Sequence, residues 1–247
     1  MGQSGSSTVA VIPARWASTR FPGKPMAELA GQPMIVHVVR RALEATSVDH
    51  VIVATDDERI AEVASAAGAE AVMTGECPSG TDRVAVAIAD RDEWEIVVNV
   101  QGDEPLLAGD NIDVLVEGLL ANESFRISTL CRPLEAERVE DPNAVKVVRD
   151  HRGRALYFSR SPIPYPLHRE VAWQMWRLHL GIYGFRRDAL AEFVSLPPSE
   201  LELAEGLEQL RALEHGIEIL VLDAPQAAFG VDTPEDLARV EKIINEY

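Results

Sequence analysis

The sequence predicts an α/β protein with a mostly parallel, doubly wound sheet and helices on both faces. From Val9 to Leu120, short apolar runs typical of buried strands alternate with helical stretches, in the order β-α-β-α-β-α-β-α. From residue 127 strand-like runs dominate instead. We therefore expect one domain, 1–247, with a smaller β-rich excursion over about 127–190.

The acidic composition of the chain argues against some classes of binding partner. The chain holds 23 Lys and Arg against 40 Asp and Glu, a formal net charge of −17. This balance argues against nucleic acid, which binds a basic face, and against an anionic membrane surface. No apolar run approaches the roughly 20 residues of a membrane span. Two cysteines do not suggest a disulfide framework, so we expect a reducing, cytoplasmic setting.

The elements of the first half follow from hydrophobic periodicity and turn signals. Predicted strands are Val9–Ile12, Val51–Ala54, Ala71–Met73 and Glu95–Val100, and predicted helices are Met34–Ala45, 57–67, 83–90 and 110–120. Thr55 or Asp56 is the expected N-cap of the helix 57–67, because short polar side chains accept the first free N–H groups. Gly68 ends that helix.

The stretch from Val9 to Pro25, VAVIPARWASTRFPGKP, places a loop with Arg15, Arg20 and Lys24 directly after the first strand. Open α/β sheets bind ligands at the carboxyl ends of their strands. Three cations within ten residues of an acidic chain indicate an anionic ligand, and a basic solvated loop is the alternative. The stretch is neither a Walker A loop nor the dinucleotide G-x-G-x-x-G motif.

A second polar stretch, Gln101–Pro105, follows the apolar strand that ends at Val100. Mg²⁺ is typically held by one or two carboxylates, waters and substrate phosphates. Asp103 is the preferred ligand. The alternative is an Asp/Glu turn that leads into the helix 110–120.

A third loop, CPSGTDR over 77–83, enters a helix. Ser79, Gly80, Thr81 and Arg83 would offer hydroxyls, N–H groups and a guanidinium to a phosphate or a base. A plain capping loop with Thr81 or Asp82 as N-cap is equally consistent with the sequence.

The second half contains strand-like runs around a proline-rich segment. The runs are Ile127–Cys131, Ala144–Val148, Ala155–Ser159 and Leu180–Phe185, and prolines exclude helix and central strand over Ser161–Pro166. This excursion would cover the ligand, pair with another subunit or pack in the core. A helix over Glu202–Glu214, a strand over Ile217–Leu222 and a last helix capped by Thr233 follow. Asp232 precedes that cap and is a candidate second metal carboxylate.

Eight motifs now occur in one order: VIPARWASTRFPGKP, PSGTDR, NVQGDEP, DPNAVKVV, ALYFSRSPIP, HLGIYGF, LEQLRALEHG and VDTPEDL. Together they closely resemble the 3-deoxy-manno-octulosonate (Kdo) cytidylyltransferase family, from Val9 to about Val240. The resemblance implies a GT-A-like, Rossmann-related nucleotidyltransferase fold and a homodimer. It implies transfer of CMP from CTP to Kdo with Mg²⁺, in the cytoplasm, for lipopolysaccharide biosynthesis.

The resemblance also implies roles for single residues. Nucleotide contacts would come from Pro13, Ala14, Arg15, Lys24, Ser79, Arg83 and Gln101, and Mg²⁺ ligands from Asp103 and Asp232. The sugar acid would contact Arg160, His179, Tyr183, Glu208 and Gln209. Arg15, Lys24, Asp103 and Asp232 would form the catalytic group.

Physical reasoning supports several of these roles. Arg160 suits bidentate capture of a carboxylate. For His179 a hydrogen-bonding role is favoured over a general base. Glu208 and Gln209 are adjacent on a helix and cannot share one face, so one of them can be structural.

Other functions remain open at this stage. An 8-amino variant of Kdo or a sialic acid would be the substrate of a neighbouring cytidylyltransferase. A glycosyltransferase that consumes a nucleotide sugar can carry a similar acidic metal motif. A regulator on the same fold would bind CTP without turnover, although two metal carboxylates weigh against it.

Overall fold

The computed structural model describes residues 7–17, 21–168, 174–231 and 233–246. The chain forms two compact units. The first contains Met1–Asp113 with Gln226–Tyr247, and the second contains Val114–Pro225. The expected excursion, 127–190, begins and ends inside the second unit.

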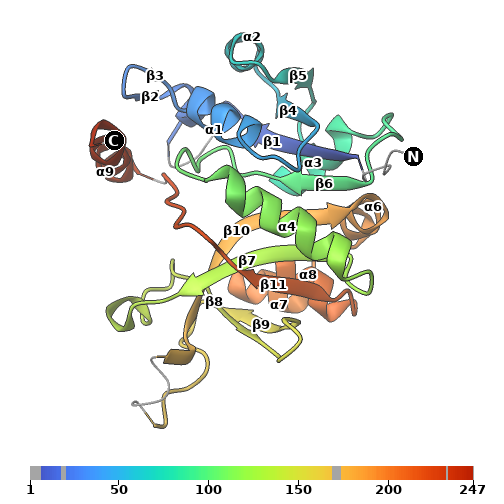
Figure 1. Cartoon of the computed structure of the whole chain (residues 1–247), viewed down its shortest axis with the longest axis vertical. Helices are drawn as coiled ribbons and strands as arrows, with labels where there is room; N and C mark the ends of the chain where they lie inside the picture. Colours follow the sequence, from blue (N-terminus) through green and yellow to red (C-terminus); the bar gives the residue numbers. More distant parts are fainter. Residues whose placement is uncertain (1–6, 18–20, 169–173, 232, 247) are drawn as a thin grey trace. The chain divides into compact units, whose positions relative to one another are not determined.

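The first unit contains the parallel sheet that the sequence predicts (Figure 1). Its strands lie in the order β6 (Ile96–Asn99), β1 (Thr8–Ala14), β4 (His50–Thr55) and β5 (Glu70–Met73), and all neighbouring pairs are parallel. The residues of β6 are fully or almost fully buried, as are most residues of β1 and β4. Buried parallel strands are continuous apolar runs, which explains their clear signal in the sequence. The predicted α/β class is confirmed.

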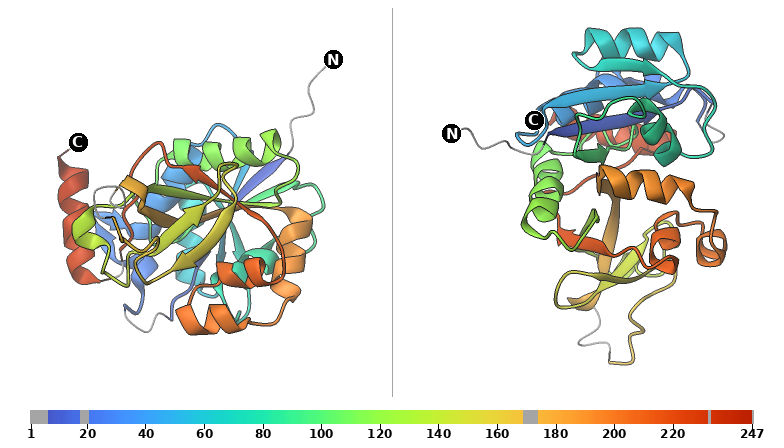
Figure 2. Two further views of the ribbon diagram at one scale, coloured as in Figure 1. Left: turned by 90° about the horizontal axis from the view of Figure 1, so that it is seen from below. Right: turned by 90° about the vertical axis from the view of Figure 1, so that its right-hand side faces the viewer.

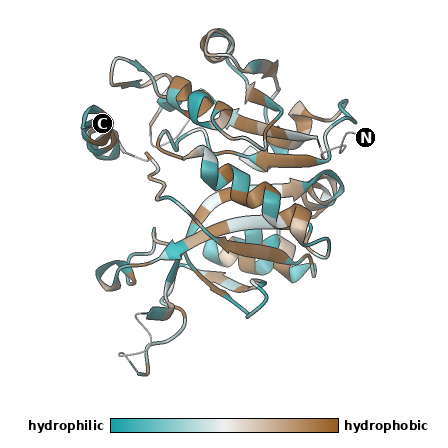
Figure 3. Ribbon diagram, in the orientation of Figure 1, coloured by the Kyte–Doolittle hydropathy of each residue, from teal (hydrophilic) through white to brown (hydrophobic). Residues whose placement is uncertain are grey.

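Helices and short elements connect these strands. They are η1 (Lys24–Met26), β2 (Glu28–Leu29), β3 (Gln32–Pro33), α1 (Met34–Leu43), α2 (Glu58–Ala66) and α3 (Gly80–Ala87). One further helix, α4 (Gly109–Ala121), follows β6 and leads to the second unit. The α1 helix is amphipathic, with an apolar side that is buried and a polar side that faces outward (Figure 3).

The N-caps of α2 and α3 differ from the prediction. Asp57 caps α2 by accepting the N–H of Arg59, so neither Thr55 nor Asp56 does so. Ser79 caps α3 by accepting the N–H of Asp82, so Thr81 and Asp82 lie inside the helix. Both helices begin within three residues of the expected position, where several polar residues in a row make the cap ambiguous.

The chain returns to the first unit through α9 (Pro234–Asn245). Thr233 is its N-cap in a capping box with Asp236, and Pro234 occupies the first turn, as predicted. Val240 joins Leu29, Met34 and Val231 in a buried cluster, which fixes this helix against the N-terminal half of the chain.

The second unit is built on β7 (Ile127–Pro133). This strand pairs in parallel with β11 (Ile219–Asp223) and antiparallel with β10 (Arg177–Arg186). Strands β8 (Lys146–Arg149) and β9 (Ala155–Ser159) form an antiparallel hairpin, drawn in yellow in Figure 2, and β8 also pairs with β10. All of the predicted strands are present, and β10 is longer than expected.

Short helices complete this unit. They are η2 (Ala136–Arg138), α6 (Arg187–Ser195), α7 (Glu200–Glu205) and α8 (Gln209–Glu214). The proline-rich segment over Ser161–Pro166 forms neither helix nor strand, as predicted. Among the helices that the structure describes, none is long and apolar enough to span a bilayer.

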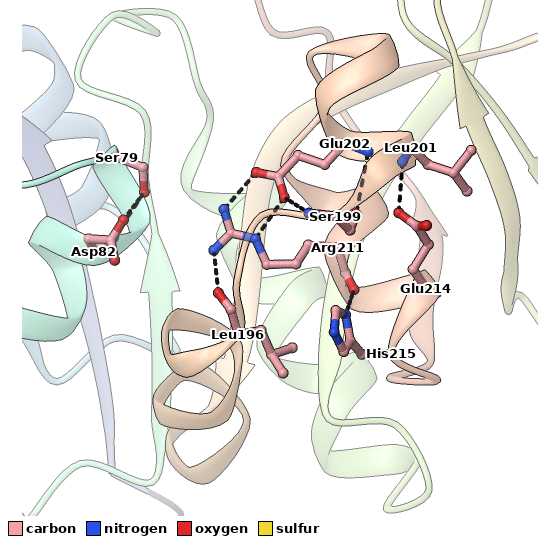
Figure 4. A network of polar contacts seen from close by, with 9 residues as sticks. All are labelled: Ser79, Asp82, Leu196, Ser199, Leu201, Glu202, Arg211, Glu214 and His215. Carbon is pink, nitrogen blue, oxygen red and sulfur yellow. Dashed lines mark hydrogen bonds and ion pairs between the residues drawn. The ribbon is translucent and has the colours of Figure 1, made fainter.

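The prediction of one helix over Glu202–Glu214 is wrong. Gly206, in the left-handed region with φ 61°, ends α7, and a new helix begins at Gln209. Arg211 of α8 forms an ion pair with Glu202 of α7 at 2.6 Å, and Glu202 also accepts the N–H of Ser199 (Figure 4). This buried polar network holds the two short helices together.

Candidate functional site

A cleft of about 270 Å³ opens where β1 and β6 end in the first unit. It is lined by Pro13, Ala14, Arg15, Lys24, Pro25, Cys77, Pro78, Ser79, Gly80, Arg83, Gln101, Gly102 and Asp103. Three separate segments therefore meet at the carboxyl edge of the parallel sheet, as expected for a ligand site in this class of fold. Every residue that the resemblance assigns to the nucleotide lies in this lining, whereas Thr81, which the third loop also offered, does not.

The two most polar segments are joined by an ion pair. Lys24 Nζ lies 2.6 Å from an Asp103 carboxylate oxygen, and the Lys24 side chain is only 11% exposed. Gly102 brings the second segment close to the first: a Cβ atom there would lie 2.8 Å from the Pro13 carbonyl oxygen. Position 102, between β6 and Asp103, must therefore be glycine.

Asp56 is a residue of this site that the sequence analysis treated only as a possible helix cap. One of its carboxylate oxygens accepts the N–H of Trp16 at 3.1 Å, and the other accepts from Arg83 Nη2 at 2.8 Å. Arg83 is 4% exposed and also donates to Thr74. Asp56 thus fixes a buried cation of the cleft to the loop after β1. Asp56 follows the carboxyl end of β4, the strand next to β1, and this position could have indicated from the sequence that it belongs to the site.

The Trp16 ring contacts Arg59 of α2 and Gly23 of the same loop. The Arg59 guanidinium lies 3.5 Å from the ring centroid, within cation–π range. Gly23 lies beside the ring, where a Cβ atom would be 3.1 Å from it, and its N–H donates to the Trp16 carbonyl. These contacts hold Trp16 in place within the loop, although Arg15 beside it is exposed.

The Ser79 hydroxyl is engaged within its own helix. It donates to the Asp82 carboxylate at 2.7 Å and accepts the Asp82 N–H (Figure 4). Ser79 therefore caps α3, in place of the predicted Thr81 or Asp82, and it also lines the cleft. Its contact with a phosphate or a base stays a prediction.

Two buried oxygen atoms near the end of β6 have no hydrogen-bond partner in the part of the chain that the structure describes. One carboxylate oxygen of Glu104 is buried with no hydrogen-bond partner among the described residues, and the same is true of the Asn99 side-chain oxygen. Burial, with the Asp103 charge as a smaller cause, raises the pKa of Glu104 to about 8. Glu104 is therefore largely protonated at neutral pH.

Among the described residues that line the cleft, Asp103 supplies a carboxylate of the kind that a hard divalent cation prefers. The Asp103 carboxylate is 36% exposed in the cleft. Within the described residues, no group of three or more His, Cys, Asp or Glu side chains could hold a metal. Mg²⁺ is typically held by one or two carboxylates, waters and substrate phosphates, so Asp103 as a ligand of Mg²⁺ stays a prediction. Asp232 and Arg20 lie outside the described residues. Val231, which precedes Asp232, donates its N–H to the Asp103 carbonyl at 2.8 Å.

The residues expected to surround the sugar acid all belong to the second unit. His179 and Tyr183 of β10 have ring centroids 5.5 Å apart, and His179 also meets Phe158 edge-on at 4.9 Å. Burial, with the negative charge of Glu208 as a smaller cause, raises the pKa of Tyr183 well above its usual value. Gln209 is 7% exposed, and its amide nitrogen has no partner among the described residues.

The Arg160 guanidinium, which the sequence analysis assigned to the sugar carboxylate, already donates hydrogen bonds within the protein. Its Nε, Nη1 and Nη2 atoms donate to the carbonyl oxygens of Glu205, Pro142 and Gly206. A guanidinium has five N–H groups, so one remains on each terminal nitrogen. Arg160 therefore first fastens the end of α7 to the loop before β8, and two N–H groups are left for an anion.

The family model described as cytidylyltransferase matches residues 9–219. A 3-deoxy-manno-octulosonate cytidylyltransferase from Anaeromyxobacter sp. is 52% identical over 95% of both chains. The protein of that name from Thermodesulfovibrio yellowstonii is 47% identical over 97% of this chain and 99% of its own. The chain therefore belongs to the cytidylyltransferase family.

The chain is also similar to solved structures. CMP:2-keto-3-deoxy-manno-octonic acid synthetase complexed with CTP superposes with a TM-score of 0.93 at 42% identity. The alignment covers 98% of this chain and 99% of that chain. A cytidylyltransferase from Leptospira borgpetersenii, at 17% identity and a TM-score of 0.65, shares the fold.

Proposed function

We propose that this protein transfers CMP from CTP to the anomeric hydroxyl of 3-deoxy-D-manno-octulosonate, giving CMP-Kdo and pyrophosphate. One observation carries the proposal. The cleft at the carboxyl ends of β1 and β6 gathers Arg15, Lys24, Arg83 and Asp103 in a chain about 50% identical, over nearly its whole length, to relatives of that activity.

The chemistry requires no nucleophile from the protein. The anomeric oxygen attacks the α-phosphorus of CTP, the bond from that phosphorus to the bridging oxygen breaks, and pyrophosphate leaves. The proton of the anomeric hydroxyl passes to solvent water. Catalysis then rests on positioning and on neutralising negative charge. Arg15 and Lys24 bind the triphosphate. The backbone N–H groups of Ala14 and of the loop that follows it are further donors. Ser79, Arg83 and Gln101 contact the nucleotide.

Magnesium is part of the proposal. Asp103 and Asp232 would hold the ion, which when bound reduces the negative charge on the phosphates. Lys24 and Asp103 already neutralise each other in the cleft, at 2.6 Å. Binding of the metal nucleotide would replace this pair with two new ones, Lys24 with phosphate and Asp103 with the ion.

The sugar acid would be held by Arg160, His179, Tyr183, Glu208 and Gln209. The Gln209 amide nitrogen, which has no partner among the described residues, supports this assignment, because a buried N–H group without a hydrogen bond is costly unless a ligand accepts from it. Arg160 has one N–H left on each terminal nitrogen for the sugar carboxylate.

Pyrophosphate release tests the proposal directly. The purified protein is incubated with Mg²⁺, one nucleoside triphosphate and one sugar acid, using Kdo, its 8-amino variant and a sialic acid. We expect release with CTP and Kdo, and none with ATP or GTP. Pyrophosphate release with only one of the other sugar acids would identify that acid as the substrate in place of Kdo. CTP binding without any pyrophosphate release would favour a regulator.

We further propose a homodimer in the cytoplasm that supplies CMP-Kdo to lipopolysaccharide synthesis. Three apolar side chains around the proline-rich segment are strongly exposed: Tyr165 at 80%, Leu167 at 75% and Met175 at 55%. Such area favours a subunit interface. Sedimentation of the wild-type chain should give twice the mass of one chain, and Leu167→Asp should shift it toward the monomer.

A further inference from the structure

The strand β10 carries an irregularity next to His179. Its pairing with β7 shifts between Leu180 and Tyr183, as in a β-bulge. Thr129 of β7 faces this shift. Its hydroxyl oxygen lies 2.8 Å from the Ile182 carbonyl oxygen, 3.2 Å from the Leu180 carbonyl oxygen and 3.0 Å from His179 Nε2. Bulges commonly redirect side chains beside active sites.

The hydrogen count at Thr129 decides which groups donate. A threonine hydroxyl has one proton, and both carbonyl oxygens can only accept. Two oxygen atoms 2.8 Å apart need a proton between them, so the hydroxyl donates to the carbonyls and its lone pairs face His179. Nε2 of His179 must therefore carry a hydrogen and donate it to Thr129.

The surroundings of the ring determine its charge. His179 is buried, with Phe158 packed edge-on against it and Tyr183 beside it. This burial lowers the pKa of His179 to about 3. The imidazole is neutral at physiological pH and has one N–H, already assigned to Nε2. Nδ1 is bare and has no hydrogen-bond partner among the residues that the structure describes.

We infer that Thr129 is a positioning residue that holds His179 in the tautomer with hydrogen on Nε2, so that Nδ1 accepts a hydrogen bond from a hydroxyl of the sugar acid. The inference rests on the proposed function for the identity of the ligand. It makes His179 an acceptor that orients the sugar. The ring does not take up the proton of the anomeric hydroxyl.

The tautomer is measurable without substrate. Long-range proton–nitrogen correlation spectra of the ¹⁵N-labelled full chain separate protonated from bare imidazole nitrogens, and a His179→Gln sample identifies the right signals. We expect hydrogen on Nε2 and a bare Nδ1 throughout pH 6 to 8. Hydrogen on Nδ1, or a charged ring in this range, would overturn the inference even if the enzyme is fully active.

Kinetics test the positioning role. Thr129→Val removes the acceptor for Nε2–H, so both tautomers should become populated and KM for Kdo should rise about tenfold, with KM for CTP unchanged. Thr129→Ser keeps the hydroxyl and should restore both the wild-type nitrogen spectrum and KM. An unchanged KM for Kdo in folded Thr129→Val would refute the role.

A matched control separates this role from general loss of stability. Ser128, the neighbour of Thr129 on β7, is also fully buried, and its hydroxyl donates to the Leu115 carbonyl. Ser128→Ala should lower the unfolding temperature without changing the His179 spectrum or KM for Kdo. If Thr129→Val does not fold, the wild-type and Thr129→Ser spectra still decide the tautomer. Absence of turnover with Kdo in the wild type would reject the proposed function alone.

Discussion

The ammonium of Lys24 lies 2.6 Å from the carboxylate of Asp103, and the pair joins the loop after β1 to the loop after β6. Each partner is expected to bind a substrate component of opposite charge. The pair therefore holds both loops close to their working positions before substrate arrives, and reduces the reorganisation that binding requires.

Asp103→Asn tests this arrangement. The amide keeps the shape but cannot neutralise Lys24 or hold a cation. We expect turnover to fall by at least about 10²-fold, the loss typical of a removed electrostatic group, while the fold persists. Pyrophosphate release and circular dichroism measure the two effects. Asp110→Asn is the control, because Asp110 lies in the same unit outside the cleft lining. Near-normal turnover in Asp103→Asn would refute the metal assignment.

The structure shows which parts of the site the sequence can predict. Strands β1 and β6 are buried apolar runs that stop at polar residues, so the positions of Lys24 and Asp103 at one sheet edge follow from topology alone. Ser79 was predictable in position but ambiguous in role, because a cap and a ligand contact use the same residue types.

Contacts between distant segments were not predictable. Asp56 follows a strand and precedes a helix, which is also the pattern of an N-cap, and only the fold brings its carboxylate to Arg83. Gly206 interrupts a leucine pattern that continues on both sides, so periodicity alone favours one helix. The Arg160 contacts with three carbonyls depend on how α7 packs beside β9.

Asp56→Asn tests the link between the loop and Arg83. The amide retains an acceptor for the Trp16 N–H but loses the charge that holds the guanidinium. We expect KM for CTP to rise about tenfold, with a smaller change in kcat, because the loss of a charged hydrogen bond leaves Arg83 less well oriented. Initial rates at varied CTP and saturating Kdo give both constants.

The matched control lies at the opposite end of the same strands. Asp49 precedes β4 and accepts the N–H of Thr8 at 2.9 Å, just as Asp56 follows β4 and accepts that of Trp16. Asp49→Asn should leave KM for CTP unchanged. Equal effects of the two substitutions would show that Asp56 acts only on stability.

Gly102→Ala tests the close approach of two backbones. The added Cβ atom would lie 2.8 Å from the Pro13 carbonyl oxygen, well inside contact distance, and neither backbone can move without displacing the cleft. We expect a loss of stability of about 1–3 kcal/mol and a greater loss of kcat/KM for CTP. Gly75→Ala is the control, because a Cβ atom there meets nothing within 4 Å. Full activity in Gly102→Ala would contradict this account of the cleft.

The last prediction concerns acid stability. Glu70 of β5 forms an ion pair with Arg91, and its carboxylate lies within hydrogen-bond distance of His50 Nε2. The hydrogen bond from Arg91 is the main cause that lowers the pKa of Glu70 from 4.5 to about 2. A carboxyl group with a lowered pKa in the folded state stabilises the protein above its usual pKa. That stabilisation is lost as the pH falls from about 4.5 to 2.

Glu70→Gln removes the titrating group. At pH 7 we expect the variant to be less stable by about 1 kcal/mol or less, because the side chain is 36% exposed and solvent weakens the pair. The difference in unfolding free energy from the wild type should shrink as the pH is lowered from 6 to 3, measured by urea unfolding at each pH. Glu62→Gln, at an exposed position on α2, should show no such trend. A constant difference between Glu70→Gln and wild type across this range would show that the Glu70 pair does not contribute to acid sensitivity.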